Sequence, residues 1–399
     1  MVRFRIPVDL QGVLAQVRRI LLDPRLMLWS LVVLLMPFYV FESGLPQPAD
    51  LLGLILLIIL LRRWNGKLRP SLARPLKSLI VFMLYVIGVN IAWSFVLLTF
   101  SLDAKQGFLV APSFYIFNAL TFLAFLLMFQ RYGELLLWLT ARLVLISLFV
   151  QVAFAFVVPR VVGRSIVMFN NPNQLGYYAL LSAGILLLAQ PRLRLSTIQV
   201  TVGLAAASYL ALLSASKAAL ASIAGLGTLL LVTKFRTVIL MSLVFAVLIF
   251  TDNPFSQAME RAALRIENDK SLQFVDERGY DRIISHPEYC VLGAGEGAYN
   301  RFRETSMIGS HELHSSMGTL FFCYGIVGTI LFGVFLWRTT SGSGLRAWVI
   351  VAGVFAYGMT HQGLRFRLVW VLLGMVCALR EVAIQDRLAR GAGKAAPAP

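Results

Sequence analysis

The sequence predicts an all-α polytopic membrane protein with about 12 transmembrane helices and one large outer loop. Hydrophobic residues make up 58% of the 399 positions, charged residues make up only 14%, and the mean hydropathy is +0.78. Soluble domains carry about 25% charged residues. Apolar runs long enough to cross a bilayer recur along the whole chain. The lipid bilayer is therefore the expected environment.

Twelve apolar runs, separated by polar connections, are the expected helices. They cover residues 26–42, 50–61, 78–100, 112–130, 134–158, 174–190, 198–214, 216–233, 237–251, 315–337, 346–360 and 368–384. Nine helices thus fall within residues 1–251, behind a basic N-terminal arm, and three fall within residues 314–384. The tail at 385–399 is rich in Ala, Gly and Pro, and we expect it to be disordered.

Lys and Arg concentrate in the connections on one face, and the loop 62–77 alone carries six of them. The positive-inside rule makes this face cytoplasmic and places both termini there. The basic arm lacks a short apolar region followed by a cleavage site, so we expect it to stay as a cytoplasmic arm. The same alternation accounts for the net charge of +17, and we expect no nucleic-acid partner.

The one large hydrophilic segment, residues 252–313, falls on the outer face and holds 11 of the 19 acidic residues. Its first part has helical periodicity, and the Gly-rich stretch 285–297 is expected to be a compact loop. The three cysteines are scattered and form no metal-binding spacing, so neither a disulfide framework nor a metal is expected.

Polar residues at the outer helix ends are the candidate ligand contacts. Asn170, Asn171, Asn173 and Gln174 form a polar cluster at the start of the sixth helix. Asn171 or Asn170 could cap this helix, or the cluster could bind the hydroxyl groups of a ligand. Lys217 follows the turn at Ser214–Ser216, where it could be an interfacial anchor or a cation for a phosphate.

Two pairs of arginines lie on the same outer face. Arg278 and Arg282 are four residues apart and would share a helix face, where they could bind a phosphate or pair with neighbouring acids. Arg365 and Arg367 lie in the last outer loop against the inside bias, which snorkelling or ligand binding could explain.

His311 and His314 lie directly before the tenth helix. They lack a third ligand of suitable spacing, so a zinc site is disfavoured. A structural role at the helix start stays open, and so does a role as general base, for which the ordinary histidine pKa near neutrality is suited. A cationic, Asn-rich site with a histidine suits a lipid-linked diphosphate sugar.

The run from His314 to Gly328 resembles the motif of the bacterial O-antigen ligase and Wzy-type polymerase superfamily. In that motif a histidine opens a helix and two glycines follow eleven and fourteen residues later, where this chain has Gly325 and Gly328. Three further stretches are similar to motifs of the superfamily. They are Asn171-Pro172-Asn173, the turn ending in Ser216-Lys217, and Arg278 running into the Gly-rich stretch 293–297. The resemblance spans roughly residues 165–335.

Three positions depart from the superfamily's pattern. Ser315 stands where Asn is common, Lys217 where Arg is usual, and Gly318 where Leu is usual. A lysine would bind a phosphate as a point charge rather than bidentately.

The resemblance implies a GT-C-like fold in the bacterial inner membrane with its active site facing the periplasm. It implies metal-independent, inverting glycosyl transfer from a donor on undecaprenyl diphosphate, with no cofactor. His314, Arg278 and Lys217 would be catalytic. The expected substrate-binding residues are Asn171, Asn173, Arg282, His311 and Arg365.

The acceptor is left open by the sequence. Lipid A–core, which would make the protein an O-antigen ligase in lipopolysaccharide biosynthesis, is favoured by the length and the single dominant loop. A second lipid-linked repeat unit would make it a polysaccharide polymerase. A transporter or flippase of lipid-linked sugars would use the same cationic cavity without chemistry.

Overall fold

A computed structural model describes residues 10–394, except 43, 99–104, 159–163, 194, 234–238, 240–242, 244–253, 268–273, 305–307 and 310. Helices and short 3₁₀ turns make up all the regular secondary structure of these residues. The helices are α1 (Leu10–Leu22), α2 (Pro24–Leu35), α3 (Pro48–Leu61), α4 (Pro70–Leu98), α5 (Lys105–Tyr132), α6 (Glu134–Val157), α7 (Pro172–Leu193), α8 (Thr197–Ser214), α9 (Lys217–Thr233), α11 (Pro254–Glu267), α12 (Phe274–Glu277), α13 (Asp281–Ser285), α14 (Ser316–Thr340), α15 (Leu345–Gly358) and α16 (Arg367–Lys394), with 3₁₀ turns at Pro287–Tyr289 and Tyr299–Phe302.

Eleven of the twelve expected helices have a counterpart at overlapping residues, and the run 237–251 lies almost entirely outside the described residues. Several bounds differ, since α2 ends at Leu35 instead of residue 42, and α4 and α5 begin at Pro70 and Lys105 instead of residues 78 and 112. Six helices (α4, α5, α6, α8, α14 and α16) are long and apolar enough to cross a membrane, and α2, α3, α15 and the start of α9 are shorter apolar helices. The protein is therefore a helical membrane protein, and twelve crossings stay a prediction.

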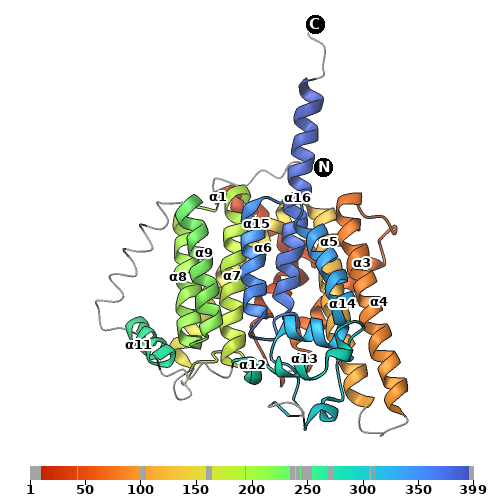
Figure 1. Ribbon diagram of the computed structural model, residues 1–399. Helices are drawn as coiled ribbons and strands as arrows, with labels where there is room; N and C mark the ends of the chain where they lie inside the picture. Colours follow the sequence, from red (N-terminus) through yellow and green to blue (C-terminus); the bar gives the residue numbers. More distant parts are fainter. Residues whose placement is uncertain are drawn as a thin grey trace.

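The helices form one bundle in which α11, α12 and α13 lie at one end, opposite α1 and the far end of α16 (Figure 1). The helical periodicity in the first part of the segment 252–313 is confirmed by α11. The tail differs from the prediction, since α16 continues as a helix ten residues past the expected end at 384. Residues 395–399 lie outside the described part of the chain.

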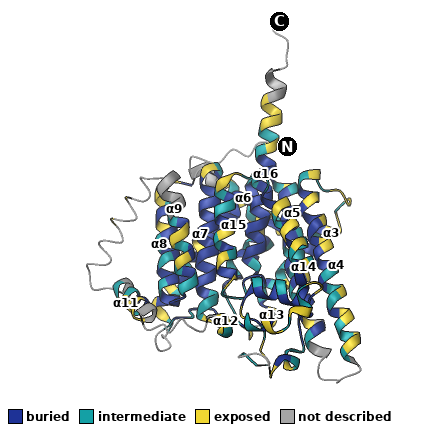
Figure 2. Cartoon of the chain, viewed as in Figure 1, coloured by how far each residue is buried: buried dark blue, intermediate teal, exposed yellow. Residues whose placement is uncertain are grey.

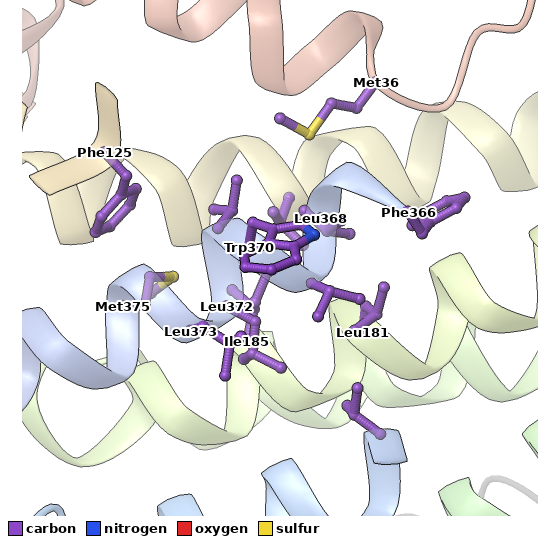
Figure 3. Packing of buried hydrophobic residues seen from close by; sticks show 14 of the residues in the cluster. Met36, Phe125, Leu181, Ile185, Phe366, Leu368, Trp370, Leu372, Leu373 and Met375 are labelled. Atoms are coloured by element: carbon purple, nitrogen blue, oxygen red, sulfur yellow. The ribbon is translucent and has the colours of Figure 1, made fainter. Parts of the chain in front are cut away.

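The inner helices are buried by their neighbours, and the outer ones carry more exposed residues (Figure 2), many of which are apolar. The most apolar stretch of α16 is 78% buried, against 28% for α4, on which Leu84 and Phe95 are exposed. Trp370 of α16 is fully buried among residues of several helices, and its indole N–H donates to the carbonyl oxygen of Leu364 at 2.9 Å (Figure 3). Exposed apolar residues on the outer helices are what contact with lipid requires.

Helix α14 is broken at Gly325, whose φ of +63° favours glycine. The Gly-rich loop fills the break. The N–H of Ile326 donates to the carbonyl oxygen of Cys290 at 2.8 Å, and the N–H of Gly295 donates to that of Cys323 at 2.8 Å. The loop thereby satisfies backbone groups that the helix leaves unpaired, as an apolar environment demands. In Figure 1 the part of α14 before the break runs across the end of the bundle.

Candidate functional site

The loop segment around Arg278 is fixed to the start of α14 by hydrogen bonds. The backbone N–H of His314 donates to the carbonyl oxygen of Arg278 at 3.3 Å. Two residues later, the hydroxyl of Tyr280 lies 2.7 Å from the Oγ of Ser315, and it donates to the carbonyl oxygen of Met359 at 2.7 Å. The predicted base and the predicted loop cation are therefore adjacent, although 36 residues separate them.

The start of α14 also binds the loop between α15 and α16. Ser315 caps the helix, since its Oγ accepts from the N–H of Gly318 at 2.9 Å. The Oγ of Ser316 accepts from the N–H of Gly363 at 2.6 Å and donates to the carbonyl oxygen of His361 at 3.1 Å. The segment around Arg278, the start of α14 and the loop after α15 thus meet next to His314.

Asn171 and Asn173 hold the start of α7, as one of the two alternatives predicts. The Oδ1 of Asn171 accepts from the N–H of Asn173 at 2.8 Å. The Oδ1 of Asn173 accepts from Nη2 of Arg164 at 2.6 Å. The same guanidinium donates through Nε to the carbonyl oxygen of Ser214 at 2.8 Å. Arg164 therefore joins the Asn cluster to the turn that precedes Lys217.

Close packing brings this turn against α7. A Cβ atom on Gly176 would lie 2.6 Å from the Oγ of Ser214 and 3.0 Å from the Cβ of Ser216, so only glycine permits the approach. Small residues at helix contacts allow backbones in a membrane protein to pack this closely. Lys217 follows as the first residue of α9 and is partly exposed.

Tyr357 connects the start of α7 to the loop segment around Arg278. Its hydroxyl donates to the carbonyl oxygen of Asn173 at 2.8 Å. Its hydroxyl also lies within electrostatic range of the guanidinium groups of Arg164 and Arg278. Arg278 in turn acts electrostatically on His314. The structure thus gathers His314, two arginines and the Asn cluster around the C-terminal end of α15.

His314 lies in surroundings that favour the neutral imidazole. Its side chain is exposed at the protein surface, yet desolvation by the neighbouring groups is the main cause of a pKa below the ordinary histidine value. The carboxylate of Glu312 raises the pKa, whereas the charges of Arg278 and His311 lower it. A neutral histidine at pH 7 can accept a proton.

Arg365 is committed to two carboxylates. It forms ion pairs with buried Glu296 and, at 2.7 Å, with Glu312, and it stacks over Phe114 with 4.9 Å to the ring centroid. Burial alone would lower the pKa of Arg365, but the carboxylates of Glu296 and Glu312 hold it well above the ordinary value. Its position differs from that of an open phosphate ligand, because two acids already balance its charge.

Arg282 is fully buried, so it too differs from the expected ligand contact. Its Nη2 donates to the carbonyl oxygens of Gly309 at 2.8 Å and His311 at 3.0 Å, and the guanidinium lies over the ring of Phe302 at 5.2 Å. Arg282 thereby supports the backbone before the histidines. The side chain of His311 is exposed.

Four residues of the site escaped the sequence prediction, namely Arg164, Tyr280, Glu296 and Tyr357. Glu296 is buried, and it accepts from the hydroxyl of Tyr324 at 2.7 Å besides pairing with Arg365. Its place inside the Gly-rich stretch was the available signal, because a lone acid there needs a cationic partner. Arg164 carried a weaker signal as one of few basic residues on the face that the sequence predicts to be outer.

The described residues contain no group of three His, Cys, Asp or Glu side chains that could hold a metal ion. No protein-family model matches the sequence, and no curated protein matches it. The resemblance to the O-antigen ligase and Wzy-type polymerase superfamily therefore stays a prediction.

Proposed function

We propose that this protein is a metal-independent, inverting membrane glycosyltransferase that moves a glycan from undecaprenyl diphosphate to an acceptor sugar. The proposal includes the GT-C-like fold with twelve crossings, an inner-membrane location and a site facing the periplasm. The observation that carries it is the adjacency of His314 to Arg278, because a base and a diphosphate cation must both reach one anomeric centre.

The reaction is a single displacement. The imidazole of His314 takes the proton of the acceptor hydroxyl as the oxygen attacks the anomeric carbon from the face opposite the diphosphate. The bond between that carbon and the diphosphate oxygen breaks, and undecaprenyl diphosphate leaves with both bonding electrons. The configuration at the anomeric carbon inverts.

Cations stabilise the leaving group. Arg278 and Lys217 neutralise the negative charge that grows on the diphosphate. Arg164, which donates hydrogen bonds to Asn173 and to the carbonyl oxygen of Ser214, adds a third positive charge to the site. The side-chain NH₂ groups of Asn171 and Asn173 donate to sugar hydroxyls, since their oxygens are already used within the protein.

Arg365 and Arg282 are assigned to positioning. Arg365 forms ion pairs with both Glu312, two residues before His314, and buried Glu296, and so joins the two carboxylates. Arg282 holds the carbonyl oxygen of His311. Neither residue is proposed to touch the diphosphate, which revises the expectation from the sequence.

Lipid A–core is the acceptor we favour, which makes the reaction O-antigen ligation. A deletion strain tests this choice. Full-length polymer retained on the carrier lipid indicates a ligase, whereas single repeat units indicate a polymerase. Proteoliposomes with a fluorescent donor test the class of protein, since donor translocation without transfer would point to a flippase.

A further inference from the structure

A basic cleft lies at the end of the bundle opposite His314. It has a volume of about 830 Å³ and lies between α1, the start of α2 and the residues that follow α3. Arg18, Arg19, Arg25 and Arg63 line it, and Asp23 is its one acidic residue. In Figure 1, α1 and the loop elements α11–α13 lie at opposite ends of the bundle. The cleft is therefore separate from the proposed active site.

The cleft exists because the chain turns at Asp23-Pro24. Pro24 has no N–H for the preceding turn of helix, so α1 ends and α2 begins in a new direction. The Oδ1 of Asp23 accepts from the N–H of Arg25 at 3.0 Å and caps α2. The turn leaves Arg18 and Arg19, in the last part of α1, beside Arg63.

The cationic charge of the cleft exceeds its acidic charge. Asp23 is already engaged, with Oδ1 at 3.9 Å from the guanidinium of Arg25 and Oδ2 accepting from the hydroxyl of Tyr132 at 2.6 Å. Among the described residues, Arg18, Arg19 and Arg63 have no ion-pair partner. Three guanidinium groups are thus available to an anion.

Leu22 lines the same cleft, and further apolar side chains of α1 lie next to it in the sequence. Leu21 and Leu22, next to the arginines, are 65% and 72% exposed, and Val17 is also exposed. A helix with basic residues and exposed leucines lies in the interface of a membrane, with its apolar side among the acyl chains. A free phosphate would use only the arginines, whereas a phospholipid uses both groups of side chains.

We propose that the cleft binds the headgroup of an anionic phospholipid, with the phosphate on Arg18, Arg19 and Arg63 and the acyl chains against Leu21 and Leu22. Bound lipid fixes α1 to the membrane surface at the end of the bundle where α16 also ends. The site is independent of the glycosyltransferase proposal, because it shares no residue with it.

The test is native mass spectrometry of the full-length purified protein with added phosphatidylglycerol, and with phosphatidylcholine as the zwitterionic comparison. The wild type should retain phosphatidylglycerol in preference. The double variant Arg18→Gln/Arg19→Gln should bind phosphatidylglycerol with an affinity at least about tenfold lower. Arg63→Gln, outside α1, should weaken it independently, which guards against a double variant that fails to fold.

The matched control is Arg387→Gln/Arg390→Gln. These two exposed arginines lie on α16 at the same end of the protein, and their removal changes the net charge equally. The control should bind phosphatidylglycerol like the wild type. Equal losses in both double variants, or no loss in either, would overturn the proposal. Displacement of the lipid by inorganic phosphate, but not by chloride at equal ionic strength, would instead assign the cleft to a free anion.

Discussion

The backbone N–H of His314 donates to the carbonyl oxygen of Arg278 at 3.3 Å. This bond uses main-chain atoms only, so it survives substitution of either side chain. The proposed base and the proposed cation can therefore be tested separately, without separating the loop from α14.

Arg278→Ala should lower kcat/KM for glycan transfer by about 100-fold or more, because a charge aimed at the leaving diphosphate is lost. Thermal unfolding should be nearly unchanged. Arg261→Ala is the control, since Arg261 lies on α11 and donates to Gln257 of the same helix at 3.3 Å. Equal losses of activity in the two variants would mean that the loop acts through its overall charge.

The pH profile of kcat/KM should report His314, because its neutral form accepts the proton. Desolvation by neighbouring groups lowers its pKa, so the acid limb should lie below the ordinary value of about 6.5. Glu312→Gln removes a charge that raises this pKa, and the limb should move to lower pH. Arg278→Ala removes a charge that lowers it, and the limb should move to higher pH.

The control for this profile is Glu304→Gln, an exposed acid of the same outer segment, which should leave the limb in place. Shifts of the same sign in Glu312→Gln and Arg278→Ala would exclude His314 as the titrating group.

Glu296→Gln should destabilise the protein by about 3 kcal/mol, because it removes the carboxylate of buried Glu296 from its ion pair with Arg365. The midpoint of thermal unfolding in detergent measures the effect. The double variant Glu296→Gln/Arg365→Gln should lose less stability than the two single variants added together. Additive losses would show that the pair is not coupled.

Gly325→Ala should displace the Gly-rich loop from α14. The new Cβ would collide with the carbonyl oxygen of Val291, and alanine is strained at a φ of +63°. The unfolding midpoint should fall and transfer should decrease. Gly333→Ala in the same helix meets no atom within 4 Å and should be neutral or slightly stabilising. A tolerated Gly325→Ala would mean that the break in α14 is not required.

The helices were predictable because lipid demands long apolar runs, and each such run is visible in the sequence. The break in α14 was not predicted, since Gly325 sits inside a continuous apolar run and the loop that fills the break comes from residues 290–297. Helix α1 was anticipated only as part of a basic N-terminal arm, because it is too polar for a membrane span.

At the candidate site, the sequence could place the polar motifs on one face but could not say which charges are balanced. His314 and Arg278 lie together as expected. Arg282 and Arg365 do not remain open to a ligand, because their partners, the carbonyl oxygens of residues 309 and 311 and the carboxylate of Glu296, are fixed only by tertiary packing. No local sequence pattern predicts such partners.

The most direct measurement is transfer by the purified protein from a defined undecaprenyl-diphosphate-linked donor, with released undecaprenyl diphosphate and glycosylated acceptor both quantified. His314→Ala should reduce both products by about 100-fold to 10,000-fold, whereas His311→Ala should change them by less than about threefold. Transfer by His314→Ala at the wild-type rate would contradict the central claim.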